Sequence, residues 1–257
     1  MFIGVRISAM NNSPVVVVTG SSSGIGKATA IKFAQHHYRI SLSGRNEDAL
    51  AEVVKECEVA GAQAVTTTIG DLRDSSVARD LVEHTIKEFG QLDVLVNSAG
   101  ILVTGSVEDV IQLTKFAIPH IIKQQGAIVN VSSVAGPRPF ADVAFYCMSK
   151  AALDQFTKCL SLELAPHNVR VNSVNPGVIV SNIHKRAGMN DAEYKEVKME
   201  FLFFEHRLFS SWKKENELTR WVALEHPMKL PMESTSWRQK NHRLQLDICF
   251  SKTAVVI

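Results

Sequence analysis

A tyrosine and a lysine stand four positions apart in the segment Tyr146-Cys147-Met148-Ser149-Lys150, within a predicted helix. This spacing places both side chains on one face of the helix, one turn apart. A nearby ammonium favours the phenolate and is expected to lower a tyrosine pKa of about 10, so that Tyr146 can exchange protons near neutrality. A Tyr/Lys pair at helical spacing is by itself more typical of a solvated surface. Ser133, at the end of the preceding predicted strand, favours catalysis because such strand ends face the ligand crevice.

A glycine-rich segment near the start of the chain has the composition of a phosphate-binding turn. It reads Thr19-Gly20-Ser21-Ser22-Ser23-Gly24-Ile25-Gly26, directly follows a β-branched run and opens a predicted helix. Glycines there allow a tight turn and a close approach to a pyrophosphate, whose charge lies at the helix N-terminus. An ordinary βα loop is the alternative interpretation. The position after the first strand of a βαβ series favours dinucleotide binding.

The end of the second predicted strand indicates which dinucleotide is preferred. A site that prefers NAD usually has an acidic residue here, which holds the ribose hydroxyls. This chain has Gly44 followed by Arg45, and the next acidic residue is Glu47. A guanidinium suits a 2′-phosphate, so Arg45 favours NADP(H) over NAD(H). The alternative is a solvated arginine at the start of a helix.

The order of the predicted elements positions these residues. From Val15 onward, short apolar β-branched runs alternate with longer helical stretches, which is typical of βαβ units around a buried parallel sheet. The predicted strands are 15–19, 39–43, 64–69, 92–97, 127–132 and 170–175. The predicted helices are 24–37, 47–60, 74–89, 107–125 and 144–165, with Asp74 as an N-cap and Gly90 as a C-cap. We therefore predict an α/β fold with a doubly wound parallel sheet of about six strands, ordered 3-2-1-4-5-6.

The composition excludes several classes of protein. The 257 residues are 46% hydrophobic and 21% charged with a net charge of +2, which argues against a disordered chain and gives no case for nucleic acid or membrane lipid as a partner. We find no signal peptide in the first ten residues and no apolar run near the roughly 20 residues of a membrane span. The four cysteines (Cys57, Cys147, Cys159 and Cys249) form no CxxC pair, so no metal site or disulfide framework is indicated. We expect reduced thiols and a cytoplasmic protein.

The character of the sequence changes after Gly188. All 14 glycines lie at or before this residue, whereas all three tryptophans follow it. An α/β domain uses glycine at helix ends and turns, so the tail is not expected to continue the same architecture. We predict a dinucleotide-binding domain over 1–188 that carries the catalytic residues, followed by a divergent tail over 189–257 that is irregular or helical. A shifted reading frame is one hypothesis for its origin, and a genuinely divergent tail is the alternative.

Taken together, these motifs resemble the short-chain dehydrogenase/reductase family from about residue 15 to about residue 195. Besides the TGxxxGIG turn, the chain carries the family's Asn-x-Ala-Gly segment as Asn97-Ser98-Ala99-Gly100, the YxxxK pair, and Pro176-Gly177. Ser133 precedes Tyr146 by 13 positions, as the family's catalytic serine does.

The resemblance implies hydride transfer between NADP(H) and the carbonyl or alcohol carbon of a small molecule, with no metal. Tyr146 would exchange the substrate proton, Lys150 would lower the tyrosine pKa and bind ribose hydroxyls, and Ser133 would hydrogen-bond the substrate oxygen. Asp71 would bind the adenine edge, and Asn97 would brace the central strands. The remaining cofactor contacts are implied at Leu72, Ala99, Gly100, Pro176, Gly177, Val178 and Ser181.

Two departures from the family pattern bear on activity. The connection from Ile101 to Gly126 lacks the helix segment that carries the family's fourth catalytic residue, an asparagine, and contains no asparagine. The tail does not show the sequence pattern of the family's last helix and strand. An impaired isoform or a nucleotide-binding pseudoenzyme is therefore the alternative to an active enzyme, and homo-oligomers built through these elements are expected to be weakened. A methyltransferase is disfavoured by the Tyr/Lys pair.

Overall fold

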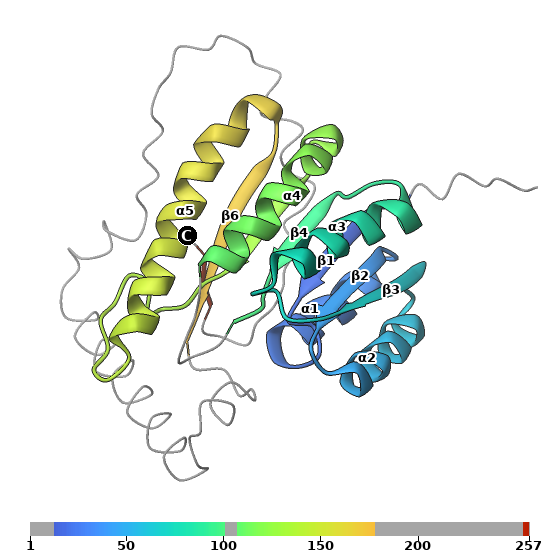
Figure 1. Ribbon diagram of the computed structural model, residues 1–257, viewed down its shortest axis with the longest axis horizontal. Helices are drawn as coiled ribbons and strands as arrows, with labels where there is room; N and C mark the ends of the chain where they lie inside the picture. Colours follow the sequence, from blue (N-terminus) through green and yellow to red (C-terminus); the bar gives the residue numbers. More distant parts are fainter. Residues whose placement is uncertain (1–12, 101–106, 178–253, 257) are drawn as a thin grey trace, which may run out of the picture. The chain divides into compact units, whose positions relative to one another are not determined.

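The computed structural model describes residues 13–100, 107–177 and 254–256 (Figure 1). The strands are β1 (Val15–Thr19), β2 (Arg39–Gly44), β3 (Ala64–Ile69), β4 (Val94–Asn97), β5 (Ala127–Val131), β6 (Arg170–Pro176) and β7 (Ala254–Val256). The helices are α1 (Gly24–Gln35), α2 (Glu47–Ala60), α3 (Ser75–Phe89), α4 (Glu108–Gln124), α5 (Ala144–Leu164) and the short 3-10 helix η1 (Ala165–His167). Each of the six strands and five helices predicted from the sequence is present, with ends displaced by at most two residues.

The strands form one sheet in the order β3-β2-β1-β4-β5-β6-β7, and β1 to β6 are parallel. The predicted doubly wound Rossmann sheet is therefore confirmed. The prediction that no strand follows Gly188 is wrong for one short segment, because β7 pairs antiparallel with the end of β6. Three residues are too few to leave a period in the sequence, which explains why β7 was not expected.

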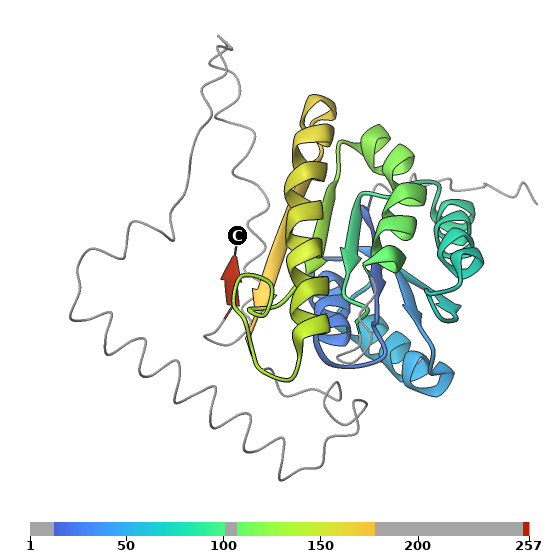
Figure 2. The same cartoon turned by 60° about the vertical axis from the view of Figure 1, so that its left-hand side comes forward.

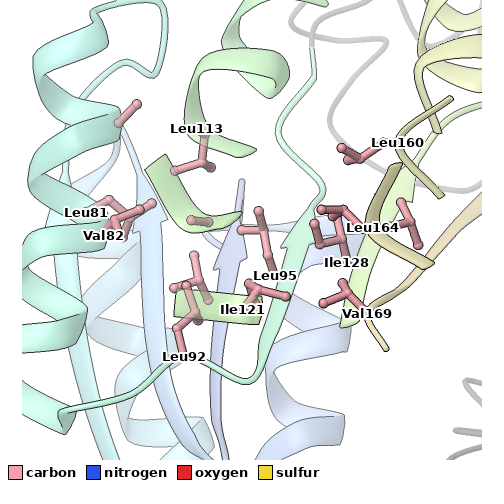
Figure 3. Packing of buried hydrophobic residues seen from close by; sticks show 14 of the residues in the cluster. Leu81, Val82, Leu92, Leu95, Leu113, Ile121, Ile128, Leu160, Leu164 and Val169 are labelled. Atoms are coloured by element: carbon pink, nitrogen blue, oxygen red, sulfur yellow. The ribbon is translucent and has the colours of Figure 1, made fainter. Parts of the chain in front are cut away.

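The two faces of the sheet are covered by different helices, as Figures 1 and 2 show. On one face, alternate β1 residues Val15 and Val17 join an apolar cluster with residues of α3, α4 and α5 (Figure 3). Val16 and Val18 point to the opposite face, where α1 packs on β1 and α2 packs beside α1. All four valines have no exposed surface. Burial on both faces explains why these strands are continuous apolar runs rather than alternating ones.

Two helix ends confirm the capping residues chosen from the sequence. The Asp74 carboxylate accepts a hydrogen bond from Ser76 N and begins α3, and Gly90 ends it with φ +74°. The shortened connection from Ile101 to Gly126 still contains one continuous helix, α4, of 17 residues. The shortened crossover therefore still brings β5 beside β4 in the parallel register.

Several predictions fall outside the described residues. These concern the first ten residues, where no signal peptide is found, and the tail over 189–257 apart from β7, so the predicted division of domains stays a prediction. None of the helices in the described part of the chain is long and apolar enough to cross a membrane.

Candidate active site

The glycine turn lies where the sheet reverses its direction of winding, between β1 and β4. Gly20 has φ +62°, and a Cβ atom there would lie 2.8 Å from Ala99 Cα. A Cβ at Gly26 would overlap the Gly20 carbonyl oxygen. The turn therefore packs backbone against backbone on both sides, which explains the requirement for glycine at these two positions. A crevice at this switch point is the general ligand site of open parallel sheets.

Thr19 fixes the turn to the neighbouring strand. Its Oγ1 accepts hydrogen bonds from Ser98 N at 2.9 Å and Ala99 N at 3.0 Å, and donates to Val96 O at 3.4 Å. Thr19 is 1% exposed, so these bonds form away from solvent. The start of the Asn-x-Ala-Gly segment is thereby held beside the glycine turn.

A pocket opens at this edge of the sheet. It is lined by Thr19, Gly20, Ser22, Ser43, Gly44, Arg45, Gly70, Asp71, Leu72, Arg73, Asn97, Ala99, Gly100, Asp109, Val110 and Leu113. Nine of the residues predicted to bind cofactor are among these: Thr19, Gly20, Ser22, Arg45, Asp71, Leu72, Asn97, Ala99 and Gly100. Ser23, Gly24, Ile25 and Gly26 belong to the cap and first turn of α1 and do not line the pocket, whereas Val178 and Ser181 lie outside the described residues.

Charged groups gather on the wall of the pocket formed by the ends of β2 and β3. Arg73 Nη2 lies 2.6 Å from Asp71 Oδ2, and its Nε donates to Asp71 Oδ1 at 3.1 Å. Arg45 Nη1 lies 3.5 Å from Asp71 Oδ2, and half of the Arg45 side chain is exposed. The hydrogen bond from Arg73 holds the Asp71 pKa at about 2. The pocket therefore presents an ionised carboxylate between two guanidinium groups.

Ser133, Tyr146 and Lys150 come together at the ends of β5 and the start of α5. Ser133 lies close enough to Tyr146 to lower the pKa of the phenol, and the Ser133 Oγ accepts a hydrogen bond from Ala135 N at 3.1 Å. The Lys150 Nζ atom lies 5.7 Å from the centroid of the Tyr146 ring. The arrangement joins a phenol, a hydroxyl and an amine, which are the groups that the sequence predicted to act together.

The electrostatics of this trio differ from the expectation. Burial raises the Tyr146 pKa above its usual value, and the side chain of Ser133 offsets this in part. The expected lowering of the Tyr146 pKa is not found, because Lys150 Nζ donates instead to the Val131 carbonyl at 2.9 Å. Burial also lowers the Lys150 pKa to about 8, partly offset by Asp154. Tyr146 is therefore a neutral phenol at neutral pH in this structure.

The trio and the pocket are adjacent. A Cβ atom at Gly100, on the pocket wall, would lie 3.9 Å from Lys150 Nζ. The carbonyl of Pro176 accepts from Val134 N at 3.0 Å, so the end of β6 lies beside the Ser133 segment, with Gly177 next in the chain. A ligand that fills the pocket and passes Gly100 would reach the three side chains.

Asn97 has the bracing position that the family resemblance implies. Its Nδ2 donates to Asn130 Oδ1 at 2.8 Å and to Thr114 Oγ1 at 3.2 Å, and Asn130 in turn donates to Thr157 Oγ1 at 2.9 Å. The chain of amides and hydroxyls links β4, β5, α4 and α5 inside the core. Asn97 Oδ1 is buried with no hydrogen-bond partner among the described residues.

Several site residues were not predicted from the sequence. Arg73 follows Asp71 by two positions beyond the same strand, and its charge next to a predicted adenine contact was the available signal. Asp109, Val110 and Leu113 approach the pocket from α4, and Gly44 and Gly70 flank its charged wall. The described residues contain no group of three or more His, Cys, Asp or Glu side chains able to hold a metal ion.

Comparison with known proteins identifies the family. A family model described as short chain dehydrogenase matches residues 14–192. The chain is 34% identical to an uncharacterized oxidoreductase of Staphylococcus saprophyticus over 182 residues, covering 64% of this chain and 78% of that protein. It is 36% identical to 11-beta-hydroxysteroid dehydrogenase-like 4A of Arabidopsis thaliana over 193 residues, covering 68% of this chain and 64% of that protein. The chain thus spans less than two thirds of the plant relative, and it belongs to the short-chain dehydrogenase/reductase family.

Solved structures agree with this assignment. A short-chain dehydrogenase/reductase of unknown function from Caenorhabditis elegans, solved with cofactor, matches with a TM-score of 0.68 and 33% identity, covering 72% of this chain and 78% of that one. An actinorhodin polyketide ketoreductase variant with NADPH matches with a TM-score of 0.64 and 29% identity, covering 69% of this chain and 77% of that one. An NAD+-bound xylitol dehydrogenase matches with a TM-score of 0.61 and 28% identity, covering 64% of this chain and 70% of that one. The similar structures therefore include both NADPH and NAD+ complexes.

Proposed function

We propose that this chain is an oxidoreductase that reduces a carbonyl group of a small molecule with NADPH, or catalyses the reverse oxidation of an alcohol. The observation that carries the proposal is the Ser133–Tyr146–Lys150 trio, placed next to Gly100 at the wall of the glycine-turn pocket. Nicotinamide, when bound, supplies the hydride for the redox step. The pocket suits a dinucleotide because the backbone of Gly20 lines it without a side chain and Arg45 can pair with a phosphate.

The residues of this chain supply the proton and hold the substrate oxygen. Tyr146 stays neutral at neutral pH because burial raises its pKa, so it is ready to protonate a developing alkoxide. The Ser133 hydroxyl, which lies beside the phenol, would contact the same substrate oxygen. Lys150 keeps a positive charge behind the ring and near Gly100, where it would bind ribose hydroxyls. Because the neutral phenol can donate its proton, the site favours reduction of a carbonyl over oxidation of an alcohol.

A conservative substitution of the tyrosine tests this role. The variant Tyr146→Phe keeps the ring and removes only the hydroxyl, so we expect loss of turnover by at least about 10²-fold with unchanged NADPH affinity. Turnover is followed by nicotinamide absorbance over a panel of ketones, and affinity by fluorescence titration. A Tyr146→Phe protein that keeps the wild-type rate would exclude Tyr146 as the acid.

The preference for NADP(H) is tested at Arg45. Charge-assisted hydrogen bonds contribute about 1.5–3 kcal/mol, so Arg45→Ala is expected to weaken NADPH binding roughly ten- to a hundred-fold while NADH affinity changes little. The matched control is Arg79→Ala, which removes a guanidinium that stacks on Phe116 outside the pocket lining. Equal losses for the two cofactors in Arg45→Ala would contradict the assignment.

A second candidate function is a nucleotide-binding protein with little or no turnover. The observation that favours it is α4, which begins at Glu108 and contains no asparagine. The family's fourth catalytic residue therefore has no counterpart in the described part of this helix. The Tyr146 assay distinguishes the two: wild-type chain that binds NADPH and shows no turnover on any ketone supports the second function.

We also propose the setting in which the protein acts. Residues 1–188 would form the cofactor-binding and catalytic domain, joined at its sheet edge by β7, with the rest of the tail over 189–257 as a divergent region. The cysteines Cys57, Cys147 and Cys159 are free thiols, which supports a reducing compartment such as the cytoplasm. We expect any homo-oligomer to be weakened by the shortened α4, which size-exclusion chromatography with light scattering would measure.

A further inference from the structure

A buried carboxylate lies one helical turn behind the lysine of the active site. Asp154 follows Lys150 by four positions on α5 and Tyr146 by eight, so the three side chains share one face of the helix. Asp154 is 8% exposed. A buried carboxylate is costly unless hydrogen bonds or a nearby cation compensate for lost solvation, so its presence requires an explanation.

The strand β6 provides the hydrogen bonds. Asn175 Nδ2 lies 3.1 Å and 3.0 Å from the two Asp154 oxygens, and Ser173 Oγ lies 3.3 Å from Oδ1. The same Asn175 amide donates to the Ser133 carbonyl at 2.9 Å. Its two hydrogens therefore connect the carboxylate to the backbone of the serine segment. Asn175 is 1% exposed, so this connection is fixed within the core.

The loop after β5 closes the remaining side of the carboxylate. A Cβ atom at Gly136 would overlap Asp154 Oδ2 and would lie 3.2 Å from the Lys150 carbonyl oxygen. That carbonyl also accepts a hydrogen bond from Ser132 Oγ at 3.3 Å. The loop thus packs directly over the stretch of α5 between Lys150 and Asp154, which leaves little room for the carboxylate to move.

The charge of Asp154 has one counterpart nearby. No ion pair within 4 Å involves Asp154 in the described part of the chain, because Lys150 Nζ is directed toward Val131 O instead. The attraction between the two groups therefore acts through space across one helical turn, in a region of low dielectric. On α5 the Tyr146 ring faces Lys150, and the titratable thiol of Cys147 lies three positions before Lys150 on the same helix. The neighbouring segments of β4 and β5 present backbone and Ser132.

We propose that Asp154 is a positioning residue of the active site, which stabilises the Lys150 ammonium through space while Asn175 and Ser173 hold its carboxylate in place. Burial would otherwise favour the neutral amine, and a neutral amine would lose the positive charge proposed to bind the ribose hydroxyls. The catalytic consequence rests on the proposed function, whereas the effect on Lys150 does not.

The test is the titration of Lys150 in Asp154→Asn, measured without cofactor or substrate by lysine-selective ¹⁵N NMR, with the signal assigned through Lys150→Arg. The Lys150 pKa is about 8 in the wild-type structure, and Asp154 raises it. Removing this opposite charge should lower the Lys150 pKa below its wild-type value. The control Glu163→Gln removes an exposed carboxylate from the same helix and should leave the Lys150 pKa unchanged.

Two outcomes would overturn the proposal. One is an Asp154→Asn protein that loses thermal stability while its Lys150 pKa stays at the wild-type value, since Asp154 would then be structural only. If Asp154→Asn does not fold, the wild-type Lys150 is titrated at about 0.05 M and about 0.5 M salt, where a buried field should be little screened. A Lys150 pKa that moves with salt as exposed lysines do would equally refute the proposal. A pKa shift without turnover would support Asp154 and count only against the proposed enzyme activity.

Discussion

The energetic effect of the close approach of Gly20 to Ala99 can be measured by comparison with Gly90. Both glycines have a positive φ, but a Cβ atom at Gly90 would have no atom near it. Gly20 has φ +62°, and a methyl group added there would lie 2.8 Å from Ala99 Cα, whereas Gly90 has φ +74° and nothing within 4 Å of the equivalent position. An L-residue in this left-handed region costs about 1–2 kcal/mol, which is the full expected loss for Gly90→Ala. In Gly20→Ala the new methyl also lies well inside normal carbon contact against backbone, adding about 1–3 kcal/mol.

Urea unfolding at equilibrium gives the two free energies of unfolding. We expect Gly20→Ala to lose about 2–5 kcal/mol and Gly90→Ala about 1–2 kcal/mol, with the difference reporting the contact between the β1 turn and the end of β4. NADPH affinity is the second measurement: only Gly20→Ala should weaken it, by more than about tenfold, because Gly90 is not part of the pocket lining. Equal stability losses in the two variants would refute the argument that backbone proximity requires glycine at position 20.

Two further predictions concern charged groups. Arg39 is 8% exposed and donates to the carbonyls of Ser13 and Phe89, so Arg39→Met should lose about 2–4 kcal/mol in urea unfolding by leaving those oxygens unpaired; a loss below about 0.5 kcal/mol would contradict this. The Asp71 pKa is lowered to about 2, so its pairing with Arg73 stabilises the fold fully above about pH 4 and is lost as the pH falls toward 2. Wild type should therefore lose more stability than Asp71→Asn between pH 4 and pH 2, and parallel curves for the two proteins would exclude the effect.

Most of the sheet was predictable because its signals are local. Each parallel strand is a short β-branched run, and caps such as Asp74 and Gly90 mark the ends of a helix within the same segment. The strand β7 was missed because three residues carry no period, and its pairing with β6 is a long-range contact.

The site was predictable to the extent that its residues share a turn or a helix. Tyr146 and Lys150 lie on one helix, and their common face follows from their spacing. The partner of Asp154 could not be foreseen, because Asn175 lies 21 positions away on another element and only the packing of α5 on β6 joins them. The direction of the Tyr146 pKa shift was also inaccessible, because burial depends on the whole fold whereas the spacing reported only a nearby charge.

The pairing of β7 with β6 bears on how the molecule avoids self-association through its sheet edge. The outer edge of a parallel sheet exposes N–H and C=O groups that can recruit a strand from another molecule. In β6 the first half carries the exposed polar residues Arg170 and Asn172, which discourage such pairing through charge and hydration. The second half, from Val174 to Pro176, is occupied instead by β7 of the same chain. Polar residues and an added strand of the same chain thus each cover part of the β6 edge, and removing residues 254–256 is expected to increase association between copies through this edge.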